Sequence, residues 1–141
     1  MSGGYIHCGE FSGDDKSGSA ISGVLEALPE CVADDMRGEF ADTVSIPLAE
    51  YLEAAEDHFL IEPEMSAQLI EPVDRLYERY GNELGHPEPF EALQLDDDRG
   101  LDPTEAKWGK GIGWRYYCLH DLRIALRQSL ESGEPVVISF D

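Results

Sequence analysis

The sequence predicts an α+β fold: a helix-rich single domain over residues 1–141, with a small β-sheet pairing the N-terminal and C-terminal strands. β-Branched and aromatic residues dominate Val136–Phe140, which indicates a buried strand that needs a partner. Between the two ends, apolar residues recur mainly at steps of three and four, the spacing of amphipathic helices. The length and a hydrophobic share of 42% suffice for one core.

The first elements follow from short local patterns. Tyr5–Cys8, flanked by glycines, is the predicted partner of the C-terminal strand. The residues of Gly13–Gly18 are typical of a turn, and Ser19–Leu28 has a helical stripe that Pro29 ends. The apolar residues of Cys31–Phe40 follow neither the helical nor the strand spacing. β-Branched residues in Thr43–Ile46 predict a third short strand.

Two helices are predicted in the middle of the chain. Pro47 opens the first of them at its first turn, and its predicted buried stripe is Leu48, Tyr51, Leu52, Ala55 and Phe59. The second runs from Pro63 to Tyr80 and ends at Gly81-Asn82. Pro72 lies inside it and is expected to kink the helix or split it, because proline lacks an amide hydrogen.

The last third contains one strong helix. Apolar residues recur through Tyr116–Leu130, and Gly133 and Pro135 supply its stop. Before it, Asp96–Gly100 is expected to be an exposed turn. A short helix is expected to start at Asp102 and to run to about Trp108.

Charge is the dominant compositional feature. Thirty acidic residues face ten basic ones, for a formal net charge of −20. Such a surface repels nucleic acid and anionic membranes and attracts basic proteins. Two other accounts of the acidity stay open: adaptation to high salt, and solubility alone.

The expected compartment is the cytoplasm. Three widely spaced cysteines do not suggest a disulfide framework. The N-terminal stretch lacks the basic and apolar regions of a signal peptide, and no apolar run reaches the roughly 18 residues that a membrane helix needs.

Three groups are candidate binding residues. The first is an acidic helix face, which is either a docking surface or simply solvated. The second is an acidic run expected at a turn. The third is an aromatic and arginine cluster, which has the composition of an interface hot spot but is also typical of a core. The acidic helix face comprises Glu50, Glu53, Glu56 and Asp57, and the acidic run comprises Asp96, Asp97 and Asp98. The aromatic and arginine cluster comprises Trp108, Trp114, Arg115 and Tyr116.

No metal, cofactor or firm catalytic set is predicted. Counted from Asp96, a calcium loop would need glycine at its sixth position and glutamate at its twelfth, where Leu101 and Lys107 stand. The glycines of 109–113 lack phosphate-loop spacing. Cys118 and His120, together with His7, form the one weak catalytic alternative, a Cys–His nucleophile pair.

These observations favour a small acidic cytoplasmic binding protein. It is expected to dock on a basic protein and to neutralise or escort it, as immunity proteins, antitoxins and nucleic-acid mimics do. The argument is one of class, because no motif carries it. A Cys/His-dependent enzyme of unknown substrate and a structural subunit of a larger assembly are the alternatives. The oligomeric state does not follow from the sequence.

Overall fold

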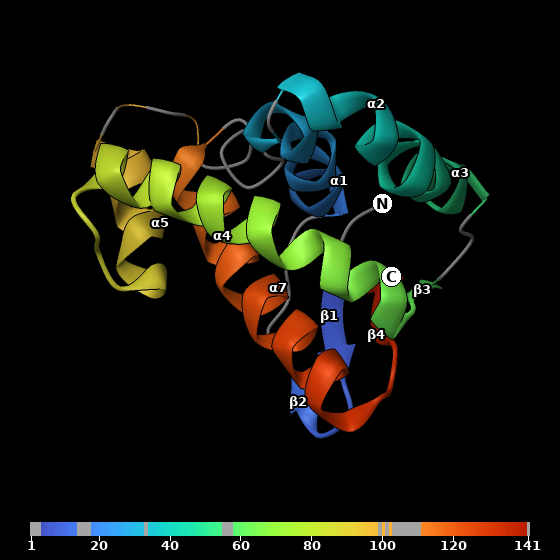
Figure 1. The fold of residues 1–141 in the computed structure, drawn as a ribbon. Helices are drawn as coiled ribbons and strands as arrows, with labels where there is room; N and C mark the ends of the chain where they lie inside the picture. Colours follow the sequence, from blue (N-terminus) through green and yellow to red (C-terminus); the bar gives the residue numbers. More distant parts are fainter. Residues whose placement is uncertain are drawn as a thin grey trace.

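The fold is α+β, as predicted, with many helices and one small antiparallel sheet (Figure 1). A computed structural model describes residues 4–13, 18–32, 34–54, 58–98, 100, 102 and 111–140. The strands are β1 (Gly4–Cys8), β2 (Phe11–Ser12), β3 (His58–Ile61) and β4 (Val136–Phe140). The helical elements are α1 (Gly18–Ala27), η1 (Leu28–Cys31), η2 (Asp34–Met36), α2 (Arg37–Phe40), η3 (Ala41–Ser45), α3 (Ile46–Ala54), α4 (Pro63–Leu84), α5 (Pro89–Asp98) and α7 (Ile112–Ser132).

The sheet joins the two ends of the chain. Its strand order is β2-β1-β4-β3, and β1 and β4 form the central antiparallel pair, with Gly4 opposite Phe140 and Ile6 opposite Ile138. The predicted pairing of the N-terminal and C-terminal strands is therefore confirmed. Ile6 and Ile138 are 1% and 0% exposed, because α7 packs against their face of the sheet (Figure 1).

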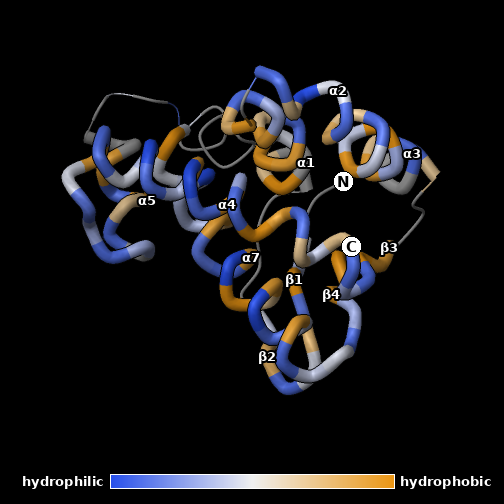
Figure 2. The backbone as a smooth tube through the Cα atoms, viewed as in Figure 1, coloured by the Kyte–Doolittle hydropathy of each residue, from blue (hydrophilic) through white to orange (hydrophobic). Residues whose placement is uncertain are grey.

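The helices form the rest of the core. α4 and α7 lie side by side, and α1 and α5 pack on α7 at other points along it (Figure 1). Hydrophobic residues gather along β1, β4 and the facing parts of α1 and α7 (Figure 2). Among the described residues, none of the helices combines the length and the apolar character that crossing a bilayer requires.

The predicted strand at Thr43–Ile46 is wrong. These residues belong to a helical run from Arg37 to Ala54, which includes the π-helical segment η3. Pro47 offers a physical reason for the π-helical geometry, because proline has no amide hydrogen and crowds the carbonyl four residues back. The wider π spacing, in which the Ile46 amide donates to the Ala41 carbonyl, accommodates the proline within a continuous helix. Val44 is fully buried in this run.

Phe59 was predicted on a helix stripe and lies instead in β3. It stands opposite Ile138 of β4 and is buried, while its neighbours His58 and Leu60 are exposed. The alternation shows a half-buried edge strand. The stripe members Leu48 and Phe59 are thus both buried, but on different elements. Ala55 lies outside the described residues, as do the side chains of Tyr51 and Leu52.

α4 is not split at Pro72 and ends later than expected. It continues to Leu84, where Gly85 takes the left-handed conformation with φ 83°. Buried residues on both sides of the proline, Leu69 and Val73 among them, hold the two halves against the core. This packing offsets the lost helical hydrogen bond.

The remaining differences lie near α5 and α7. Of the predicted exposed turn at Asp96–Gly100, Asp96–Asp98 is instead the last turn of α5, whereas Gly100 is an exposed turn residue as predicted. α7 begins earlier than predicted, at Ile112, and Gly133 ends it with φ 77°, as the sequence indicated. The helix expected from Asp102 to Trp108 falls mostly on residues outside those described.

Candidate functional site

The helical layer from Glu26 to Glu53 is unusually poor in cations. We call it the acidic layer. It carries eight carboxylates and one arginine, Arg37, whose guanidinium is 2.8 Å from Asp34. The carboxylates, all exposed, belong to Glu26, Glu30, Asp34, Asp35, Glu39, Asp42, Glu50 and Glu53.

The other described arginines lie elsewhere, on α4 and α7: Arg75, Arg79, Arg115, Arg123 and Arg127. Carboxylates also occur on those helices and on the other described elements. The acidic layer shares its excess of acids over cations with α5, which has four acidic residues and neither arginine nor lysine. Few cations in the layer offset the negative field of its carboxylates.

A groove of about 660 Å³ separates the acidic layer from α4. We call it the acidic groove. Its apolar part includes three buried residues, Cys31, Phe40 and Pro72, and the half-buried Val32. Met36 also lines the groove, with 52% of its surface exposed. The remaining lining residues are Asp35, Glu39, Thr43, Ala67, Gln68, Glu71 and Arg75.

Side-chain hydrogen bonds join the two walls of the groove. Arg75 on α4 donates from Nη1 to the Cys31 carbonyl at 3.0 Å and also pairs with Glu71. At another point the Thr43 hydroxyl donates to Gln68 Oε1 at 3.0 Å. These contacts fix the two walls relative to each other, so a ligand would meet a largely preformed surface.

Two carboxylates of the groove, Asp35 and Glu39, stand apart from the Arg75–Glu71 pair. Within the part of the chain that the structure describes, neither Asp35 nor Glu39 has an ion-pair partner. Both are exposed and both stand close in sequence to the exposed Met36. An apolar surface bordered by unpaired carboxylates is complementary to a ligand that is both apolar and cationic.

A second pocket, of about 550 Å³, lies between α1 and α3. We call it the side pocket. It is lined by Leu25, Glu26, Pro29, Ser45, Leu48, Ala49 and Glu53. The Ser45 hydroxyl is buried and has no hydrogen-bond partner among the described residues. A buried polar atom of this kind is uncommon in folded proteins.

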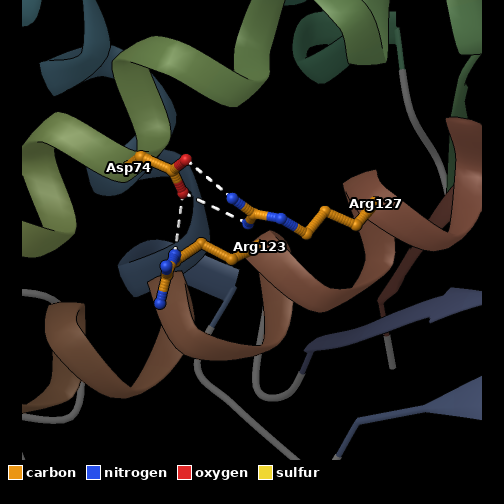
Figure 3. A network of polar contacts seen from close by, with 3 residues as sticks. All are labelled: Asp74, Arg123 and Arg127. Atoms are coloured by element: carbon orange, nitrogen blue, oxygen red, sulfur yellow. Dashed lines mark hydrogen bonds and ion pairs between the residues drawn. The ribbon is translucent and has the colours of Figure 1, made fainter.

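A polar network fixes α4, the far wall of the acidic groove, to α7 (Figure 3). Asp74 accepts hydrogen bonds from Arg123 and Arg127, with the closest contact to each at 2.8 and 2.9 Å. Burial alone would raise the pKa of Asp74, but the two arginines outweigh it and the pKa lies below its usual value. The Arg123 guanidinium also lies 4.2 Å from the centre of the Tyr77 ring.

One described member of the predicted aromatic cluster, Tyr116, packs inside the protein, and two others are half-buried. Tyr116 is 3% exposed, stacks on Tyr77 with ring centres 4.3 Å apart, and donates its hydroxyl to the Pro87 carbonyl. Burial raises its pKa. Arg115 contacts the Tyr80 hydroxyl at 3.2 Å, and Trp114 is half-buried. These contacts place Tyr116 in the core and leave Trp114 and Arg115 partly exposed, so the binding role of the cluster stays a prediction.

The acidic candidates fall in different places. Glu50 and Glu53 are exposed on α3, inside the acidic layer. The side chains of Asp96, Asp97 and Asp98, at the end of α5, lie outside the described residues. The same holds for Glu56, Asp57 and Trp108.

The structure does not bring together the residues of the weak catalytic alternative. Cys118 is 1% exposed in the core. His120, two positions later on α7 and hence roughly 200° around the helix, tilts against Tyr77. His7 is on the face of the sheet away from Ile6 and α7, where its ring contacts Ser12 and Ser139. Among the described residues, no group of three or more His, Cys, Asp or Glu side chains is placed to hold a metal.

Sequence reasoning missed the residues that build the acidic groove. Asp35, Met36 and Glu39 lie in Cys31–Phe40, the stretch whose apolar residues follow neither spacing. The available signal was a methionine that directly follows two aspartates and does not belong to an apolar run. The facing residues of α4 are about 35 positions away in the chain, so only the fold reveals the groove.

Comparisons with known protein families, with curated proteins and with solved structures found no match to this chain.

Proposed function

We propose that this protein is an acidic binding protein that docks on a basic protein and neutralises or escorts it. The acidic groove is the proposed docking site. The observation that carries the proposal is the combination of an apolar lining with two unpaired carboxylates, in a layer with one arginine.

A basic amphipathic segment has the matching chemistry. Its apolar side chains would cover Val32, Phe40 and the exposed Met36, and this burial supplies most of the affinity. Its cations would face Asp35 and Glu39, which speeds encounter and sets orientation. Methionine suits such a surface because its flexible side chain adapts to different partners.

The consequence for the partner is neutralisation. A basic surface that meets the acidic layer loses access to nucleic acid and to other polyanions, since the layer competes for the same cations. Inhibition of the immunity, antitoxin or nucleic-acid-mimic kind is the form of this function that we favour. The same docking would also serve escort of a basic protein.

The test is affinity capture from the native host with three baits. They are the wild-type protein, a groove variant with Asp35→Asn and Glu39→Gln, and a control variant with Glu10→Gln and Glu91→Gln. Both variants lose two exposed carboxylates, so their net charges are equal, and the control residues lie outside the acidic layer.

We expect a basic protein to co-purify with the wild type and the control, and to be lost from the groove variant. Raising the salt should weaken the capture, because screening weakens exposed charge pairs. Equal capture by all three baits would place binding elsewhere. A wild-type eluate without any basic protein would remove the proposal.

A further inference from the structure

The side pocket has apolar walls built from two separate helices. Leu25 near the end of α1 and Leu48 on α3 are 5% and 3% exposed, and Pro29 of η1 is half-buried beside them. These residues offer an aliphatic surface to whatever enters. The volume of about 550 Å³ is ample for one long side chain.

The polar residues of the side pocket are acidic. Glu26 on α1 and Glu53 on α3 both line it and both are exposed. Within the described part of the chain neither has an ion-pair partner. Two such carboxylates favour a cation in the pocket.

Ser45 adds an unused acceptor to the same pocket. Its hydroxyl is buried without a hydrogen-bond partner among the described residues. It belongs to the π-helical segment η3, and π-helical turns occur frequently at functional sites. The oxygen itself has almost no accessible surface, so a ligand with N–H groups would satisfy it only after the Ser45 side chain rotates toward the pocket.

We infer that the side pocket receives one long cationic side chain, a lysine or an arginine, from the basic partner. The aliphatic stem packs on Leu25 and Leu48, and the charged end is shared by Glu26 and Glu53. The Ser45 hydroxyl is a further acceptor once its side chain has rotated toward the pocket. Lysine and arginine both combine such a stem with a multiple N–H donor. The inference rests on the proposed function, since it names the part of the partner that this second site recognises.

The test uses blocked single amino acids as probes. Backbone amide spectra of ¹⁵N-labelled protein at low salt are titrated with the N-acetyl methylamides of lysine, arginine and norleucine. Norleucine has an unbranched aliphatic side chain without charge. The lysine and arginine arms also show which cation the pocket prefers.

We expect lysine or arginine to shift the amides of Leu25, Ser45 and Glu53 at millimolar concentration, and norleucine to leave them unmoved. The variant Glu26→Gln/Glu53→Gln should bind at least about fivefold more weakly, because two exposed ion pairs are lost. Ser45→Ala, which keeps both charges, should weaken binding about two- to fivefold. The matched pair Glu10→Gln/Glu91→Gln should bind like the wild type.

The inference would be overturned if norleucine bound as tightly as lysine and arginine. It would also be overturned if the Glu26→Gln/Glu53→Gln variant bound the cationic probes as tightly as the wild type does. Unchanged spectra elsewhere in each variant verify that it is folded. Failure here with intact capture of a basic protein by the wild type removes the inference alone. Intact titrations without any captured basic protein remove the proposed function instead.

Discussion

Asp74 of α4 and Arg127 of α7 form a bidentate ion pair, with Nη2 2.9 Å from Oδ2 and Nη1 3.3 Å from Oδ1. Arg123 adds a third contact, from Nε to Oδ1 at 2.8 Å. One carboxylate therefore ties two turns of α7 to the helix that forms the far wall of the acidic groove. Fork-shaped pairs of this kind resist bending more than single contacts do.

Replacing Asp74 with asparagine should destabilise the protein by about 1–2 kcal/mol. The amide keeps the size of the side chain but loses the charge that both arginines share, and the partial exposure of the three groups moderates the loss. Urea unfolding measures the change. Glu78→Gln on the exposed side of α4 is the matched control and should change stability little. Equal effects of the two substitutions would show that the network contributes nothing.

The same pair predicts a pH dependence. The two arginines hold the folded-state pKa of Asp74 below its usual value, despite the opposing effect of burial. A depressed pKa stabilises the fold above the unfolded pKa, about 3.9, and this contribution is lost as pH falls through the folded value. The stability difference between wild type and Asp74→Asn should be complete at pH 7 and should shrink below about pH 4. Urea unfolding of both proteins across this range is the measurement, and a constant difference would contradict it.

Two glycines should respond in opposite directions to alanine. Gly133 ends α7 with φ 77°, a conformation that alanine adopts only with strain, so Gly133→Ala should cost about 1 kcal/mol. Gly38 is exposed inside α2, and an added methyl group would meet nothing within 4 Å. Gly38→Ala should therefore raise stability by up to about 1 kcal/mol. Thermal unfolding of the two variants checks both signs.

Added salt should stabilise the folded protein. At a net charge of −20 the surface repels itself, and the screening length falls from about 10 Å at 0.1 M salt to about 3 Å at 1 M. We expect the unfolding temperature to rise between low and moderate sodium chloride. The variant Glu10→Gln/Glu91→Gln, which is less negative, should show a smaller rise. A chain that folds only in molar salt would instead support the high-salt account of the acidity.

The sequence predicted the frame of the fold because its signals there are local and mutually consistent. The apolar Val136–Phe140 needed a partner, and Tyr5–Cys8 supplied it. Gly133 marked the end of α7 correctly. The prediction failed at Thr43–Ile46, where β-branched residues indicated a strand and the following Pro47 indicated a helix start. The segment is helical, because Val44 packs inward on a helical run that continues past Pro47.

The site was less predictable, since it depends on contacts between distant segments. β3 was missed because Phe59 also satisfies the helical spacing of Leu48 and its neighbours, and only its pairing with Ile138 distinguishes the two. The acidic groove needs Phe40 from one segment and Pro72 from another. The predicted binding role of Glu50 and Glu53 stays a prediction, although both lie in the acidic layer.

The central pairing of β1 with β4 has a consequence for synthesis of the protein. Its partners, such as Ile6 and Ile138, are separated by nearly the whole chain, so the first strand leaves the ribosome long before the strand that completes it. Until then the edge of β1 that pairs with β4 has no neighbouring strand. Assembly must therefore wait for translation to pass Phe140, and a ribosome stalled earlier would display an open edge to chaperones.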